Sequence, residues 1–358
     1  MTMPLPPQEL VRPEIVALKA YHVAEAAGMV KLDAMENPYR LPESLRRQLA
    51  TRLAEAEINR YPEPTGRAVR ELLARKMGVP PGMQLLLGNG SDDLIQIVTF
   101  ALARPGATML IPEPTFVVYR MNATLSGMRL AGVALRPDFS LDRDAFLEQI
   151  RAERPALVFI AYPNNPTGVL YGEDDVAAII RAAEGLVVVD EAYHAFAQKS
   201  FLQRLPEFSN LAVMRTVSKL GLAGIRLGYL AALPAWVEQF NKVRQVYNVG
   251  VLTQTAASFA LEHLEVLEEQ AAAIRAARAA LGTSLAALPG VTVFPSQANF
   301  VLVRVADGPR VFNGLCRQGV LVRSFHGSHP MLAHCLRITV GTPEENRILL
   351  TAFREALR

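Results

Sequence analysis

The chain has 358 residues, of which 51% are hydrophobic and 20% charged, a composition typical of a core-rich globular protein and, at this length, of two domains. A formal net charge of +3 is too small for a nucleic-acid-binding surface, so basic chemistry should be local to a site. The proline-rich start lacks a signal-peptide core, no apolar run approaches the ~20 residues of a membrane span, and Cys316 and Cys335 have no ligand or redox spacing, so we expect a cytoplasmic protein with reduced thiols.

Residues 1–45 are expected to form an N-terminal arm. The sequence favours a helix around residues 14–28, followed by an extended stretch, 31–39, that closes in a proline turn. Two prolines and a glycine make residues 60–66 a rigid loop that presents Tyr61. Helices are expected on either side of this loop, over residues 43–56 and 68–77.

Between residues 84 and 233, short apolar segments alternate with helical patterns, which indicates an α/β fold with a mainly parallel sheet. The connection over residues 218–227 is too short for a helical crossover, so the last strand should run antiparallel to the strand before it. The expected strands are 85–88, 108–111, 129–133, 156–161, 186–190, 211–217 and 228–232, with helices over 92–103, 115–125, 174–183 and 234–243.

The remainder of the chain predicts a smaller α+β domain. A long alanine-rich helix over residues 253–287, with breaks, is expected to connect it to the sheet block. We therefore expect three parts: an arm over 1–45 that contributes to the small domain, a large domain over 46–252, and the connecting helix with the small domain over 253–358. Strands of the small domain are expected near 291–294, 300–305, 320–323 and 335–340, with helices over 308–318 and 343–358.

Polar motifs fall at the carboxyl ends of the predicted strands. Open α/β sheets bind ligands along that edge, so these motifs should share one crevice. Each motif alone is weak, because similar residues occur in ordinary turns, but together at one edge they indicate a site. The motifs are the glycine-rich stretch 88–93, Asn164-Asn165-Pro166, Asp190 with Tyr193, and Ser218-Lys219.

Lys219 follows a buried strand, where an ammonium is costly unless it is paired or used. Desolvation lowers the pKa of a lysine, which is what a Schiff-base former needs. Thr216, Ser218 and Arg226 surround it with hydroxyls and a guanidinium suited to a phosphate. The alternative is an exposed lysine after an edge strand.

Asp190 ends an apolar run, where a buried carboxylate would be justified by a protonated ring nitrogen. Tyr193 and Asn165 can hydrogen-bond a phenolate oxygen of the same ring. Ser91 and Asp92 offer N–H groups for an anion at a helix N-terminus, although a merely capped helix would use the same residues. With Lys219 for the imine, the set describes a pocket for pyridoxal phosphate as electron sink.

The chain resembles the fold type I pyridoxal-phosphate aminotransferases, and among them the branch that acts on histidinol phosphate. The resemblance covers nearly the whole chain and implies a large domain with a mainly parallel sheet, a smaller α+β domain and a homodimer. It rests on the motifs at residues 36–38, 60–62, 88–92, 164–168, 190–193, 216–219, 223–226, 299–300 and 336–342.

The resemblance also implies a role for individual residues. Lys219 would be the Schiff-base lysine and proton shuttle, and Phe116 would stack on the cofactor ring. Arg337 would bind the substrate anion, whether from glutamate, 2-oxoglutarate or histidinol phosphate. The other implied cofactor contacts are Asp190 to the ring nitrogen, Tyr193 and Asn165 to O3′, and Ser91, Asp92, Thr216, Ser218, Arg226 and the partner subunit's Tyr61 around the phosphate. The other implied substrate contacts are Tyr21, Asn37, Asn165 and Arg323.

Some positions depart from the family pattern, which leaves the substrate open. Met35 replaces a frequent asparagine, Asp93 a usual glutamate and Leu220 a small residue, and the loop from Lys219 to Arg226 is one residue short. The rival functions are an aromatic amino-acid aminotransferase, a threonine-phosphate decarboxylase of cobalamin synthesis, and a non-catalytic pyridoxal-phosphate-binding regulator, against which an intact Lys219 argues. The histidines at 326, 329 and 334, with Cys335, are interpreted as a solvated loop and not as a metal site.

Overall fold

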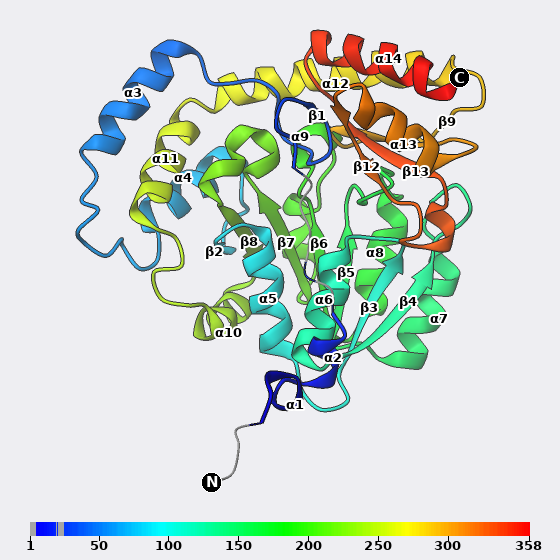
Figure 1. Cartoon of the computed structure of the whole chain (residues 1–358). Coiled ribbons are helices and arrows are strands. Elements are labelled where there is room, and N and C mark those ends of the chain that lie inside the picture. Colours follow the sequence, from blue (N-terminus) through cyan, green and yellow to red (C-terminus); the bar gives the residue numbers. More distant parts are fainter. Residues whose placement is uncertain (1–4, 19, 21–24) are drawn as a thin grey trace.

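The computed structural model describes residues 5–18, 20 and 25–358 (Figure 1). In this part of the chain, seven strands form a central sheet in the order β2-β8-β7-β6-β5-β3-β4. β8 runs antiparallel to both neighbours, whereas the pairs from β7 to β4 are parallel, as the short connection before β8 predicted. The strands are β2 (Gln84–Gly88), β3 (Thr108–Glu113), β4 (Arg129–Ala134), β5 (Leu157–Ala161), β6 (Leu186–Asp190), β7 (Leu211–Thr216) and β8 (Gly228–Ala232).

The central strands are buried on both faces because helices cover both sides of the sheet. Along β5, Leu157 and Phe159 point into one hydrophobic core and Val158 and Ile160 into the other, which is the two-residue period of a strand. One core is closed by α5 (Ser91–Leu102), α6 (Val117–Ser126) and α10 (Pro234–Val243). The other is closed by α4 (Arg67–Met77), α7 (Arg143–Glu153), α8 (Glu173–Ala182), α9 (His194–Ala197) and the 3₁₀ turn η1 (Leu202–Glu207).

The C-terminal part forms a second, antiparallel sheet in the order β12-β13-β10-β9. The arm joins this part of the molecule, because β1 (Val30–Lys31) pairs in parallel with β11 (Val320–Leu321). Figure 1 shows the long helix α12 running across the top of the molecule beside α14. The remaining elements are β9 (Thr292–Val293), β10 (Phe300–Arg304), β12 (Arg323–Ser324), β13 (Cys335–Thr339), α12 (Leu264–Ala286), α13 (Gly308–Arg317), η4 (Pro330–Leu332) and α14 (Pro343–Leu357).

The structure corrects the sequence prediction at several places. Among the described residues of the helix expected over 14–28, only α2 (Pro13–Val16) is helical, and it buries no side chain and so gains no core to extend it. α7 was not predicted, although Asp142 caps it by accepting the N–H of Ala145. The long helix divides at His263 into α11 (Val251–Glu262) and α12. The two remaining helices at the N-terminal end of the chain are the short α1 (Pro7–Leu10) and α3 (Glu43–Ala54). No helix of the described residues is long and apolar enough to cross a membrane.

Candidate active site

The carboxyl ends of β5, β6 and β7 and the N-terminus of α5 line one cavity. Every residue predicted to contact the cofactor, with the exception of Tyr61, lies in its wall. These residues are Ser91, Asp92, Phe116, Asn165, Asp190, Tyr193, Thr216, Ser218, Lys219 and Arg226, and they are joined by Met35, Tyr119, Ala161, Pro163 and Ala192. The structure therefore brings the strand-end motifs together in one cavity, as expected.

Lys219 lies in a π-helical turn, η2 (Ser218–Leu222), directly after the buried strand β7. Gly221 in this turn has a φ of 130°, a conformation that favours glycine. The ammonium donates a hydrogen bond to the carbonyl oxygen of Ala34 at 3.1 Å. Burial, followed by the positive charge of Arg337, lowers the pKa of Lys219 to about 8. The amine is therefore far easier to deprotonate than an exposed lysine.

Asp190 ends β6, with only 3% of its surface exposed. Its Oδ2 accepts the hydroxyl of Tyr119 at 2.6 Å, and its Oδ1 accepts the N–H of Ala192 at 3.1 Å. Burial raises the pKa of Asp190 to about 7, although both hydrogen bonds act in the opposite direction. A buried carboxylate that faces a cavity in this way fits a protonated ring nitrogen as its counter-charge.

An anion site lies where α5 begins. Gly90 precedes this helix with a φ of 84° and, as a glycine, has no side chain to cap the free N–H groups of the first turn. A Cβ on Gly90 would lie 2.7 Å from Nη2 of Arg226, so glycine is required for the guanidinium to approach. Thr216 donates to the Ser218 hydroxyl at 2.9 Å, and Arg226 lies 3.5 Å from the same hydroxyl. This donor set suits a phosphate group.

Arg226 also lies 3.7 Å from the carboxylate of Asp92. Asp93, where the family pattern has glutamate, accepts the N–H of Asn89 at 2.8 Å and the side-chain amide of Asn248 at 2.9 Å. The shorter carboxylate thus holds the glycine-rich turn in place, and the departure leaves the anion site intact.

Arg337 projects from β13 of the second sheet. It donates to Oδ1 of Asn165 at 2.6 Å and to the carbonyl oxygen of Asp33 at 2.8 Å, and its guanidinium lies about 5 Å from the rings of Phe300 and Phe325. Arg323 is directly opposite Arg337 in the register of β12 and β13. Like charges opposite one another are unfavourable in a sheet, so an anion beside them would be stabilising.

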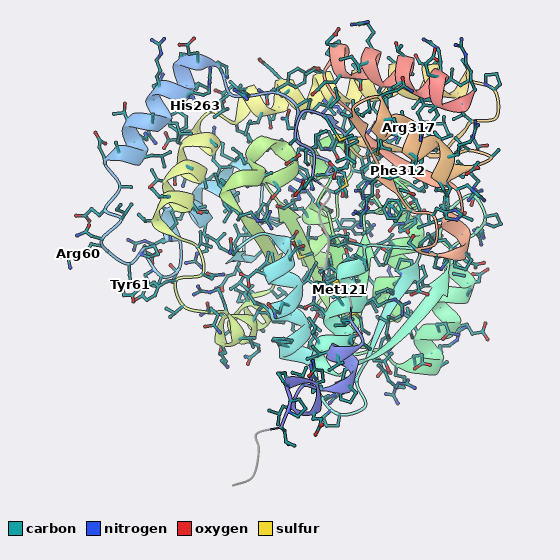
Figure 2. The ribbon with its side chains drawn as sticks, viewed as in Figure 1. Arg60, Tyr61, Met121, His263, Phe312 and Arg317 are labelled. Carbon is teal, nitrogen blue, oxygen red and sulfur yellow. The ribbon has the colours of Figure 1, made fainter. Side chains whose placement is uncertain are left out.

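Besides Arg323 and Arg337, which do not themselves line this cavity, two described residues predicted for the site lie outside its wall, Asn37 and Tyr61. Asn37 donates to the carbonyl oxygen of Leu220 and to Gln270, so it ties the arm to the lysine turn and to α12, and a direct substrate contact stays a prediction. Tyr61 is 81% exposed and stacks on Tyr247 at 4.5 Å, far to one side of the molecule in Figure 2. Tyr21 lies outside the described residues.

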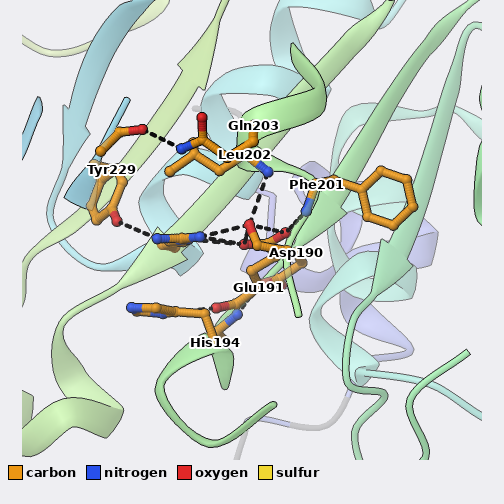
Figure 3. A network of polar contacts seen from close by, with 11 residues as sticks. Asp190, Glu191, His194, Phe201, Leu202, Gln203 and Tyr229 are labelled. Atoms are coloured by element: carbon orange, nitrogen blue, oxygen red, sulfur yellow. Dashed lines mark hydrogen bonds and ion pairs between the residues drawn. The ribbon is translucent and has the colours of Figure 1, made fainter. Parts of the chain in front are cut away.

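The sequence did not predict a buried polar network around Glu191, the residue that follows Asp190 (Figure 3). Glu191 and Arg215 form an ion pair at 2.8 Å, Arg215 also donates to Ser200 at 2.7 Å, and Glu191 accepts the N–H of Phe201 at 2.6 Å. The available signal was an arginine inside a strand that is otherwise apolar, which is as costly as the buried aspartate unless it is paired. Tyr119 was missed as well.

The histidine-rich loop packs on itself and on the start of α13, where Nδ1 of His334 accepts the N–H of Gly308 at 3.1 Å. The rings of His326 and His334 lie 4.7 Å apart, and His329 accepts the N–H of Met331. Across the described residues, no group of three or more histidine, cysteine, aspartate or glutamate side chains is placed to hold a metal ion.

The model of the family "Aminotransferase class I and II" matches residues 27–353. The chain belongs to this family. The predicted resemblance is thereby confirmed, and the cofactor of this aminotransferase is pyridoxal phosphate. The cavity fits that group, since it presents a partly desolvated lysine, a buried carboxylate and a phosphate-type donor set in one wall.

Similar proteins share nearly the full length of this aminotransferase. A histidinol-phosphate aminotransferase of Chromobacterium violaceum is 57% identical over 352 residues, which cover 98% of this chain and 99% of that protein. A second, from Cupriavidus pinatubonensis, is 54% identical and covers 98% and 97%. The solved structure of histidinol-phosphate aminotransferase from Sinorhizobium meliloti in complex with pyridoxal-5′-phosphate is 26% identical, with a TM-score of 0.87 and 97% of each chain covered.

Proposed function

We propose that this aminotransferase transfers an amino group between L-histidinol phosphate and 2-oxoglutarate, giving imidazole-acetol phosphate and L-glutamate in histidine biosynthesis. The names of its relatives above 50% identity support this substrate. The structural observation that carries the proposal is the direct opposition of Arg323 and Arg337 in neighbouring strands, with Arg337 bonded to Asn165 of the cofactor cavity. Two arginines directly opposite one another in neighbouring strands are suited to a phosphate or carboxylate substrate.

Each wall of the cavity has a separate task in this function. Bound pyridoxal phosphate supplies an electron sink for the bonds at the substrate Cα. The Lys219 amine, neutral above about pH 8, is placed to take the Cα proton and return it as a general acid. Asp190 holds a proton at the ring nitrogen through its charge. Asn165 and Tyr193 bind O3′, Phe116 stacks on the ring, and Ser91, Asp92, Thr216, Ser218 and Arg226 bind the phosphate.

The proposed enzyme is a homodimer in which Tyr61 completes the phosphate site of the partner. The loop that carries Tyr61 leaves Ile58 74% exposed, and the loop that carries its stacking partner Tyr247 leaves Val246 62% exposed. Exposed aromatic and aliphatic groups that gather on neighbouring loops are typical of a protein interface.

We also propose the domain division expected from the sequence, with residues 46–252 as the large domain and the arm joined to the small domain. The pairing of β1 with β11 supports the placement of the arm. A cytoplasmic location stays a prediction; both cysteines are free thiols, as it requires.

Kinetics with two amino donors test the substrate. If Arg323 binds the substrate phosphate, Arg323→Ala should lower kcat/KM for histidinol phosphate by about ten- to a hundredfold, the value of one charge-assisted hydrogen bond. Turnover of phenylalanine, which has no phosphate, should change much less. Arg337→Ala should reduce activity with histidinol phosphate and with glutamate, because it binds either anion.

Arg317→Ala is the matched control, because it removes the same charge from the exposed face of α13 (Figure 2). Equal losses for both donors in Arg323→Ala, or a wild-type enzyme without preference for the phosphorylated donor, would favour an aromatic amino-acid aminotransferase. The L-threonine-O-3-phosphate decarboxylase of Porphyromonas gingivalis, 20% identical with a TM-score of 0.77, shares the fold alone.

A further inference from the structure

Tyr119 of α6 has no assigned part in the reaction described above, although it lines the cofactor cavity. Its side chain is completely buried, and its hydroxyl donates to Oδ2 of Asp190 at 2.6 Å across 71 residues of sequence. This is a short, charge-assisted hydrogen bond to the carboxylate that faces the ring nitrogen.

The Tyr119 ring is held from two sides. It stacks on Phe159 of β5 with centroids 4.6 Å apart and planes 6° from parallel, and it meets the Phe116 ring edge-on at 5.6 Å. Aromatic contacts of both kinds are favourable, and together they restrict the ring to one orientation. Packing within the protein therefore aims the hydroxyl at Asp190.

The chemistry of this contact favours the charged form of Asp190. Burial, together with the adjacent Asp190 charge, raises the pKa of Tyr119 well above its usual range, so the phenol remains a neutral donor. A donor to a carboxylate stabilises the ionised form, and the N–H of Ala192 does the same at the other oxygen. Each carboxylate oxygen has a second lone pair, which leaves room for the proton of a pyridine nitrogen.

We propose that Tyr119 is a positioning residue that orients Asp190 and keeps it charged toward the protonated ring nitrogen of pyridoxal phosphate. The proposal rests on the role given to Asp190 above. Tyr119 also packs edge-on against Phe116. Tyr119 therefore aligns Asp190, proposed to bind the nitrogen at the edge of the cofactor ring, with Phe116, proposed to stack on the face of that ring.

The test compares cofactor binding by apoenzyme variants, using pyridoxal phosphate and its 1-deaza analogue, in which carbon replaces the ring nitrogen. Tyr119→Phe removes the hydroxyl and keeps both ring contacts. We expect a dissociation constant for pyridoxal phosphate about ten- to a hundredfold above that of the wild type, and no comparable change for the analogue. If Tyr119 had only a structural role, Tyr119→Phe would weaken the binding of both ligands equally.

Tyr171→Phe is the control, because Tyr171 is also a buried tyrosine and its hydroxyl finds no hydrogen-bond partner within the described part of the chain. It should bind both ligands as the wild type does, and melting temperatures of the apoenzymes show that each variant is folded. Equal losses for both ligands in Tyr119→Phe, or no loss, would overturn the proposal. A wild type that does not distinguish the two ligands would instead refute the role of Asp190.

Discussion

The lowered pKa of Lys219 makes its amine reactive at a pH where other lysines are protonated. A lysine with the usual pKa of 10.5 is neutral in about 0.3% of molecules at pH 8, whereas a pKa of about 8 leaves about half of Lys219 neutral. The neutral amine is therefore about 150 times more abundant. Burial disfavours the ammonium, so the reactive form is gained as pH rises through about 8 and is lost below it.

Competitive acetylation of the apoenzyme over a pH series, read by mass spectrometry of each lysine peptide, measures the pKa of Lys219. Lys31 is the internal reference, because burial lowers its pKa less than the carboxylates of Glu36 and Asp33 raise it. Labelling of Lys219 should have its midpoint well below that of Lys31, since the pKa of Lys219 is lowered to about 8 whereas that of Lys31 is raised above its usual value.

Arg337→Gln should move the Lys219 midpoint upward, since the Arg337 charge is the largest cause of the lowered pKa after burial. The Lys31 midpoint should stay the same. A Lys219 midpoint at or above the usual 10.5 in the wild type would refute the reasoning. So would a Lys219 midpoint that does not respond to Arg337→Gln.

Three further predictions concern the buried charges and the partner subunit. Glu191→Gln should lower the free energy of unfolding of the apoenzyme by about 3–5 kcal/mol in urea titrations, because it leaves a buried arginine without its counter-charge. Glu344→Gln, which breaks an ion pair in water, should lower it far less, and similar losses for the two variants would contradict a structural role of the buried pair. Asp190→Asn should raise the melting temperature of the apoenzyme at pH 8 and weaken cofactor binding. The pKa of Asp190 in the folded protein is about 7, about 3 units above the usual 3.8, so the folded state loses up to about 4 kcal/mol of stability as pH rises from about 4 to about 7. A lower melting temperature of the variant would contradict a destabilising Asp190 charge. Mixed dimers of Lys219→Ala and Tyr61→Ala subunits should regain part of the activity that either homodimer lacks, because one of the two sites is then intact, and verified heterodimers without recovery would exclude a shared site.

The sheet could be predicted from sequence because its strands carry their own signal. β6, Leu-Val-Val-Val-Asp, is buried at every position, so a short apolar run between turn residues was sufficient. The arm could not be predicted in the same way. Its apolar residues suggested a longer helix, but the structure gives α2 no buried face, and helix propensity without packing does not extend a helix.

The site, too, has a part that the sequence could predict and a part that it could not. Residues at strand ends, such as Asp190 and Lys219, are placed by the fold itself, so their position followed from the order of the motifs. Their partners depend on contacts between distant segments. Tyr119 meets Asp190 across 71 residues, and Asn37 meets Leu220 across 183, and neither spacing shows in local periodicity. The role of Asn37 was therefore predicted from resemblance alone.

The ion pair of Glu191 and Arg215 has a consequence for how the apoenzyme receives its cofactor. Glu191 is the neighbour of Asp190, and Arg215 lies on the strand that leads into Lys219, so the pair fastens the ends of β6 and β7 to one another. The spacing between the carboxylate of Asp190 and the amine of Lys219 is thus set by an ion pair of which neither residue is a member. Contacts within the protein therefore fix this span, which reduces the conformational entropy that ordering the two groups around a ligand would otherwise cost.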